Sequence, residues 1–206
     1  MIFRYFLMLI LLFSSPLYAA SPQMASFEIK TGFWLPEGTF NDIFSPCCNL
    51  ITKIQSGLLF NRQVGVEAGV GFLTKGGQAI SANGTPSQDR FRLYVIPLET
   101  NFVIRAEDRN WRYFAPYFKL GSDCLLYQEK TGDNTIKGIK YGLHGVGGIQ
   151  IQLTKWSDGL QTLDQSTGIN DLFLTLEAAY QWINNFGGEG ANFSGQLYSA
   201  GLLFEF

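Results

Sequence analysis

The sequence predicts an all-β fold, an eight-stranded antiparallel transmembrane up-and-down barrel, and three observations lead to this prediction. Eight segments alternate apolar and polar residues with a period of two, which is the pattern of strands with one apolar face. The 206 residues include 23 glycines, which disfavour helices because glycine costs about 1 kcal/mol per interior helix position. Aromatics reach 15% while charged residues reach only 16%, against roughly 25% charged residues in soluble domains.

The first 20 residues are expected to be a cleaved secretory signal peptide, which leaves 21–206 as the barrel domain. Arg4 precedes the apolar run 6–13, Pro16 follows it, and Ala19 and Ala20 offer small residues for cleavage. This order is typical of a secretory signal. The apolar run is shorter than the ~20 residues that a spanning helix needs.

The first four strands are expected at 26–35, 50–60, 64–72 and 90–105. Bulky apolar residues lie at every second position and small or charged residues lie between them, as in Phe27 and Glu28, Ile54 and Gln55, Val66 and Glu67, and Leu98 and Glu99. The last four strands are expected at 113–125, 139–153, 172–182 and 196–206. The sixth alternates most regularly, with Ile139, Tyr141 and Leu143 on one face and Lys140 and His144 on the other.

A soluble barrel or sandwich also alternates, so the two faces have to be compared. A soluble barrel has an apolar interior and a charged exterior. Here one face is free of charge and carries bulky apolar residues with aromatics near the strand ends, as contact with lipid requires. The other face is small or charged, which predicts a narrow polar lumen. The segments are also long enough for the 9–11 residues of a strand that crosses a bilayer.

The even number of strands predicts the topology, because it places both termini on one side of the membrane, the periplasmic side. The outer loops are then expected at 36–49, 75–89, 127–138 and 183–195. The inner turns are expected at 61–63, 106–112 and 154–170.

The last strand carries an aromatic or apolar residue at every second position up to the C-terminus: Tyr198, Ala200, Leu202, Phe204 and Phe206. Together with the signal and the eight alternating segments, this strand resembles small bacterial outer-membrane β-barrels, the porin-like eight-stranded outer-membrane proteins of Gram-negative bacteria. The resemblance implies an assembly signal at Tyr198, Leu202, Phe204 and Phe206 that the barrel-assembly machinery reads. It also implies a location in the outer membrane, with membrane lipid and lipopolysaccharide as partners.

Charged residues at inward positions are the main candidates for a functional site. They are Glu28, Lys30, Lys53, Glu67, Glu99, Lys119, Lys140, Glu177 and Glu205. Because an unpaired buried charge is costly, we expect a salt-bridge network that fills the barrel. If the 106–112 turn closes symmetrically, Glu99 lies opposite Lys119. The alternative is an ion-conducting lumen, which is disfavoured because an eight-stranded interior is just wide enough for side chains.

No convincing catalytic constellation is present, so the sequence favours a protein that is not an enzyme. His144 is the only histidine and is expected inside the barrel as a hydrogen-bonded residue. We find no nucleophile elbow, metal-ligand spacing or phosphate loop, and therefore predict no cofactor or metal. The net charge of -2 argues against nucleic acid as a partner. The expected role is structural or surface-interacting, and the alternatives are a lipid-modifying enzyme or a small-solute conduit.

Three cysteines, Cys47, Cys48 and Cys124, leave at least one unpaired thiol in a monomer. A disulfide from Cys124 to either member of the Cys47–Cys48 pair would have to arch over the barrel mouth. Strand parity instead aims Cys124 outward. A vicinal Cys47–Cys48 disulfide and free thiols are the other two interpretations, and the sequence leaves the pairing open.

Overall fold

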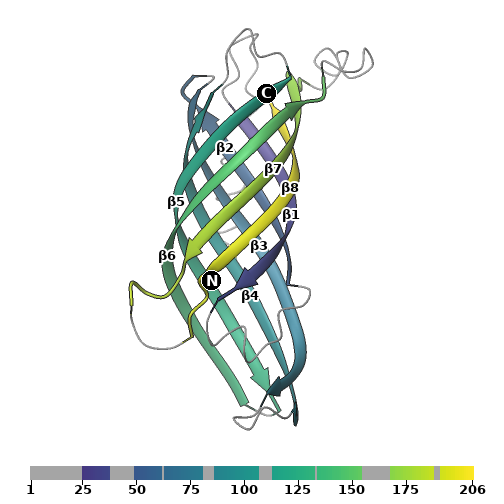
Figure 1. Ribbon diagram of the computed structural model, residues 1–206, viewed down its shortest axis with the longest axis vertical. Coiled ribbons are helices and arrows are strands. Elements are labelled where there is room, and N and C mark those ends of the chain that lie inside the picture. The colour runs from purple at the N-terminus through teal and green to yellow at the C-terminus, as the bar shows by residue number, and fades with distance from the viewer. Residues whose placement is uncertain are drawn as a thin grey trace, which may run out of the picture.

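A computed structural model shows a closed antiparallel barrel in which each strand pairs with its neighbours in sequence and the first pairs with the last (Figure 1). The strands are β1 (Ala25–Pro36), β2 (Leu50–Leu59), β3 (Val64–Ile80), β4 (Pro86–Arg105), β5 (Phe114–Thr131), β6 (Asn134–Gln152), β7 (Asp171–Trp182) and β8 (Gly195–Glu205). The predicted fold class is confirmed. The structure describes residues 25–37, 49–61, 63–80, 86–106, 113–132, 134–154, 168–187 and 191–206. The predicted signal peptide at 1–20 lies outside this range.

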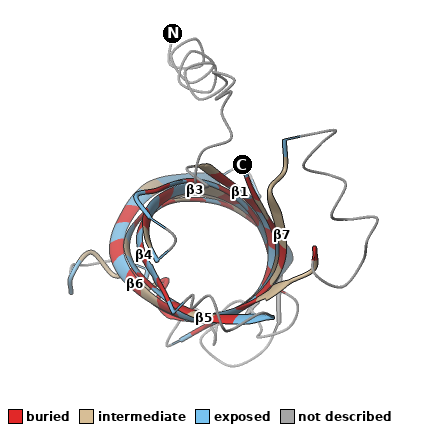
Figure 2. Cartoon of the chain, turned by 90° about the horizontal axis from the view of Figure 1, so that it is seen from above, coloured by how far each residue is buried: buried red, intermediate tan, exposed pale blue. Residues whose placement is uncertain are grey.

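The barrel closes through a long seam between β1 and β8, which pair from Ser26 opposite Glu205 to Pro36 opposite Gly195. Viewed from one end, the strands form a complete ring (Figure 2). Ala25 and Phe206 lie together at one end, where the Phe206 N–H donates to the Ala25 carbonyl at 2.9 Å. We call this the terminal end of the barrel and the opposite end the hairpin end.

Two hairpins, β3–β4 and β5–β6, continue well past the predicted strand ends and project at the bottom of Figure 1. The predicted loops 75–89 and 127–138 are therefore wrong in extent. Strand β3 runs to Ile80 and β4 starts at Pro86, while Thr131 of β5 already pairs with Asn134 of β6. The alternating pattern fades here because both faces of these extensions are largely polar or glycine, although the backbone pairing persists.

The outward face of the barrel is apolar over most of its height. Its exposed side chains occupy every second position of the strands and include Phe33, Ile54, Phe102, Leu120 and Leu143. A continuous apolar exterior of this kind is rare on soluble monomers and matches the lipid-facing band of transmembrane barrels. The described residues contain no helix that is long and apolar enough to span a membrane.

The interior is divided into two layers, which corrects the expectation of a polar lumen along its whole length. Buried apolar side chains fill the half near the hairpin end: Trp34, Ile51, Leu73, Phe91, Leu93, Val95, Leu125, Ile183, Phe193 and Leu197. We call this cluster the apolar layer. The buried charged residues lie mainly between it and the terminal end, and we call them the polar layer.

Phe193 belongs to the apolar layer although it precedes β8. Its ring stacks on Trp34 with centroids 6.2 Å apart and meets Tyr127 at 5.1 Å. The backbone holds it there, because the Phe193 N–H donates to the Ile183 carbonyl at 2.9 Å. The Ser194 hydroxyl oxygen in turn accepts from the Ile183 N–H at 3.0 Å. The segment before β8 thus anchors an aromatic ring in the barrel interior.

Candidate functional site

The polar layer is the candidate functional site, and the structure places all nine predicted inward charges in the interior. Each of these nine residues is at most 8% exposed. A water-filled lumen of this width would leave many of them accessible to solvent. The nine residues are Glu28, Lys30, Lys53, Glu67, Glu99, Lys119, Lys140, Glu177 and Glu205.

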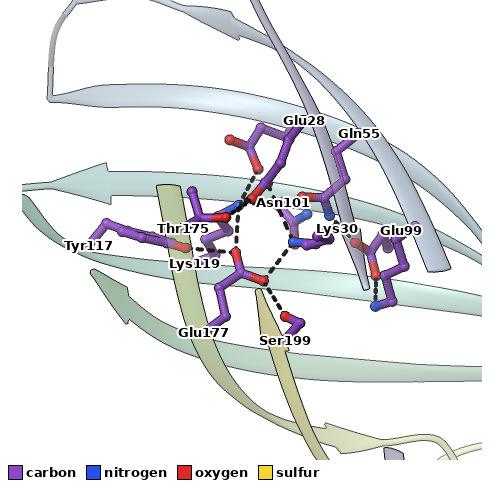
Figure 3. Close-up of polar contacts among 12 residues, drawn as sticks. Glu28, Lys30, Gln55, Glu99, Asn101, Tyr117, Lys119, Thr175, Glu177 and Ser199 are labelled. Atoms are coloured by element: carbon purple, nitrogen blue, oxygen red, sulfur yellow. Dashed lines mark hydrogen bonds and ion pairs between the residues drawn. The ribbon is translucent and has the colours of Figure 1, made fainter. Parts of the chain in front are cut away.

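Lys119 lies at the centre of the polar layer (Figure 3). Its ammonium nitrogen is 2.7 Å from the Glu67 carboxylate, 3.0 Å from Glu177 and 3.4 Å from Glu28. It also lies 5.2 Å from the centre of the Tyr117 ring. The three carboxylates come from β3, β7 and β1, so the ammonium group of Lys119 connects its own strand, β5, to three other strands across the barrel interior.

Lys30 supplies a second ammonium group to two of the same carboxylates. It lies 2.7 Å from Glu177 and 3.5 Å from Glu28. Neutral hydroxyls also donate to these two carboxylates: Thr175 to Glu28 at 2.6 Å, Tyr117 to Glu177 at 2.9 Å and Ser199 to Glu177 at 3.1 Å. These carboxylates are therefore both charge-paired and hydrogen-bonded, the two conditions that make buried ions tolerable.

Glu99 belongs to a separate pair, and its predicted partner was wrong. The Lys53 ammonium group is 2.5 Å from the Glu99 carboxylate, and the Gln55 side-chain amide donates to its other oxygen. Glu99 stands opposite Asp123 across β4–β5, whereas Lys119 stands opposite Val103. The expected opposition of Glu99 and Lys119 does not occur.

The β4–β5 register explains this error. Ile104 pairs with Phe118 rather than with Phe114, and Phe114 pairs only with Ile151 of β6. Closing a sheet of tilted strands into a barrel requires a stagger between neighbours. A symmetric closure of the 106–112 turn ignores that stagger. The described part of this turn is limited to Ala106, since 107–112 lie outside the described residues.

Sequence reasoning missed Arg105 as a member of the network. Its guanidinium group bonds the Glu205 carboxylate and lies 3.9 Å from Glu67. Arg105 is 2% exposed, although it ends β4 next to a predicted charged turn. Strand parity could have identified it. Ile104 faces outward, so the next residue, Arg105, has to face inward.

His144 is buried, with both ring nitrogens engaged. Nδ1 lies 2.8 Å from the Asp123 carboxylate, and Nε2 contacts the Asn101 side-chain oxygen. Gly121 makes room for this group, because a Cβ there would lie 2.6 Å from both the Asn101 oxygen and His144 Cε1. Among the described residues no group of His, Cys, Asp and Glu side chains is arranged to hold a metal ion.

The predicted assembly signal and the cysteines lie away from the polar layer. Tyr198, Leu202 and Phe206 are exposed on the outward face, and the Phe204 ring lies 6.4 Å from that of Phe27. Cys124 is half-buried and has a free thiol. Cys47 and Cys48 lie outside the described residues, so their pairing stays a prediction.

Comparisons with known proteins agree on the fold and go no further. No protein-family model and no curated protein sequence matches the chain. Among solved structures it is similar to OprG of Pseudomonas aeruginosa, at 13% identity over 90% of this chain and 98% of that one, with a TM-score of 0.60. The Neisserial surface protein A matches at 11% identity over 88% and 97%, with a TM-score of 0.57. The N-terminal barrel of Pseudomonas aeruginosa OprF matches at 9% over 90% and 98%, with a TM-score of 0.53.

The chain therefore has the fold of the small bacterial outer-membrane β-barrels, as its sequence predicted. Within that class it is an eight-stranded barrel whose interior combines a charge-paired polar layer with an apolar layer.

The corrected partner of Glu99 can be tested by a double-mutant cycle. Lys53→Met and Glu99→Gln should each lower the free energy of unfolding, by up to about 3–5 kcal/mol for a pair that is fully buried. The double variant should recover part of the loss, because it leaves no stranded charge. Urea unfolding in lipid vesicles measures the coupling. The control cycle pairs Glu99→Gln with Lys119→Met, and a larger coupling there than with Lys53 would contradict the assignment.

Proposed function

We propose that the chain is an integral outer-membrane barrel that is closed to solutes and has a structural or surface-interaction role. In this proposal the terminal end faces the periplasm and the hairpin end faces the outside. The observation that carries it is the filled interior. The charged side chains of the polar layer are shielded from water, and the apolar layer fills the barrel between them and the hairpin end.

The apolar outward face and the likeness to solved outer-membrane barrels support the location. The even number of strands supports a shared side for both termini, and short turns on the periplasmic side are usual for such barrels. The β2–β3 connection fits that side. It is a tight turn in which the Asn61 side-chain oxygen accepts from the N–H groups of Gln63 and Val64, at 2.8 and 2.7 Å.

The two alternative functions find less support. A conduit would have to separate Lys119 from three carboxylates and also displace the apolar layer. A lipid-modifying enzyme needs a histidine or similar group that meets an acyl chain, whereas His144 is 3% exposed and holds Asp123 and Asn101.

Three measurements test this proposal. Membrane fractions should contain a band that shifts on heating, because intact barrels resist SDS until boiled. The purified barrel in planar bilayers should show no steady ion conductance. Reproducible single-channel steps would refute the closed barrel, and altered lipid A on thin-layer plates in cells with the gene would favour the enzyme.

Phe193→Ala tests the apolar layer by itself. Truncating a buried phenylalanine typically costs about 3–5 kcal/mol, so the free energy of unfolding in vesicles should fall by this amount. Conductance should stay absent, because the polar layer still closes the barrel. Phe186→Ala is the matched control, since Phe186 is 71% exposed and its truncation should have little effect. Equal losses for both variants would contradict the buried role of Phe193.

A further inference from the structure

Three cations face outward at the hairpin end, on neighbouring strands. They are Arg92 of β4, Lys130 of β5 and Lys137 of β6, and all three are exposed. The strand register brings them together, because Arg92 stands opposite Lys130 and Lys137 stands opposite Gln128, two residues before Lys130. We call these three residues the basic patch.

The acids of the strands lie on the other face. Every acid whose side chain the structure describes within a strand occupies an inward position, in register with the interior: Glu28, Glu67, Glu99, Asp123, Glu129, Asp171, Glu177 and Glu205. The lysines of the polar layer point inward with them. Among the described strand side chains, the outward charges are thus all positive and all belong to the basic patch. These charges correct the expectation of an outward face that is free of charge.

Nothing described within the barrel compensates these charges. Directly opposed residues on one face have Cβ atoms about 4.5–5.5 Å apart, and like charges in that position are destabilising. Arg92 and Lys130 are such a pair. The arrangement becomes favourable when an anion lies between the two side chains, because a guanidinium fork and an ammonium group can then both donate to it.

The position of the basic patch along the barrel axis indicates which kind of anion it can bind. Outward residues of β4 alternate from Ile104 to Tyr94, a span of ten residues, before Arg92 follows. At about 3.3 Å per residue and a tilt of about 40° this span covers roughly 25 Å, the height of the lipid-facing band of such barrels. Arg92 therefore lies one step beyond the hydrocarbon, at the level of lipid headgroups.

The surface is also hollowed at this place. A hollow of about 810 Å³ is lined by Gly76, Arg92, Tyr94 and Lys130, among others. Gly76 stands opposite Arg92 and leaves space beside it, since a Cβ there would meet no atom closer than 3.6 Å. Arg92 Nη1 lies 3.4 Å from the Tyr94 hydroxyl, so an aromatic ring at the edge of the apolar band lies beside the cation.

We propose that the basic patch binds the phosphate groups of an anionic lipid headgroup in the outer leaflet of the membrane. The inference rests on the orientation given under the proposed function and adds a ligand class and a site to it. A lipid fits better than a soluble partner because the three side chains point sideways into the headgroup layer from strand faces. A partner that approaches from outside would first meet the hairpin tips.

The test compares lipid retention by folded barrels in non-ionic detergent, measured by native mass spectrometry. The probes are lipid A with two phosphates, the same lipid A after dephosphorylation, inorganic phosphate and a heparin-derived oligosaccharide. The mature wild-type chain should retain phosphorylated lipid A, and increasing salt should weaken retention because exposed charges are screened. The triple variant R92Q/K130Q/K137Q should retain it at least tenfold less.

Two single variants form a matched pair. Lys130→Gln should weaken retention severalfold. Lys75→Gln removes the same charge from the same end of the barrel, but it should not weaken retention. Lys75 lies on the inward side, where its ammonium group donates to the Asn49 side-chain oxygen at 2.6 Å. Equal retention by the wild type and the triple variant would overturn the inference, as would equal binding of dephosphorylated lipid A. Stronger binding of inorganic phosphate or the oligosaccharide than of lipid A would overturn the lipid assignment.

A heat-shift gel on the same samples separates this inference from the proposed function. A wild-type chain without a heat-shifted band would refute the membrane barrel itself. A heat-shifted triple variant that keeps its lipid would refute only the basic patch as a headgroup site.

Discussion

Lys119→Met is expected to remove a large part of the stability of the barrel. Deleting one partner of a buried ion pair typically costs about 3–5 kcal/mol, because the other charge is left uncompensated. Here one ammonium group serves Glu28, Glu67 and Glu177, so the loss should lie at or above the upper end of that range. Typical domains have only about 5–15 kcal/mol in total. Urea unfolding in vesicles, followed by tryptophan fluorescence, measures the loss.

Lys75→Met is the matched control for this prediction. It makes the same chemical change at a half-buried lysine that bonds the Asn49 side chain, so its effect should be much smaller. Glu177→Gln added to Lys119→Met should recover part of the loss by removing one stranded carboxylate. If Lys119→Met unfolded at the same urea concentration as the wild type, Lys119 would not be the centre of the polar layer.

Deleting Phe206 is expected to remove most of the protein from the outer membrane. The resemblance to small outer-membrane barrels assigns this residue to the signal that the assembly machinery reads. Phe206 is exposed on the outward face, and its backbone exchanges only two hydrogen bonds with Ala25, at 2.9 and 3.5 Å. Its deletion should therefore impair delivery far more than stability. Immunoblots of separated membranes measure the level.

Two comparisons separate delivery from folding in this experiment. Phe206→Tyr keeps an aromatic ring at the terminus and should reach the outer membrane at nearly normal levels. The purified deletion variant, refolded into vesicles, should unfold close to the urea concentration of the wild type. A normal membrane level of the deletion variant would refute the assembly signal, and a large loss of stability in vesicles would show a structural role instead.

The face on which each strand residue lies could be predicted from the sequence. The period-two pattern is local, so Glu28, Lys119 and Glu205 could be assigned to the interior without knowledge of any neighbour. Their partners could not be predicted, because a pairing such as Glu99 with Lys53 depends on the stagger of the whole closed sheet. Only the three-dimensional register fixes that stagger.

The apolar layer and the hairpin extensions escaped prediction for opposite reasons. Around Val95 both faces of β4 are apolar, because Tyr94 and Ile96 face outward, so an inward apolar residue looks the same as a lipid-facing one. In the extensions, such as the first four residues of β6 (Asn134–Lys137), the side chains on both faces are exposed and the alternation fades. The alternating pattern is informative only where the two sides of a strand meet different environments.

The spread of the polar layer along the chain has a consequence for how the barrel folds. Lys119 and Glu28 are 91 residues apart, Lys30 and Glu177 are 147 apart, and Arg105 and Glu205 are 100 apart. No hairpin on its own contains these pairs, so a partly formed sheet holds ions without partners. Such a sheet has a large penalty for entering lipid, and the penalty disappears only when β1 meets β8. Ring closure and membrane insertion are therefore expected to occur as one cooperative step, and open or misregistered sheets are excluded from the bilayer by their own charges.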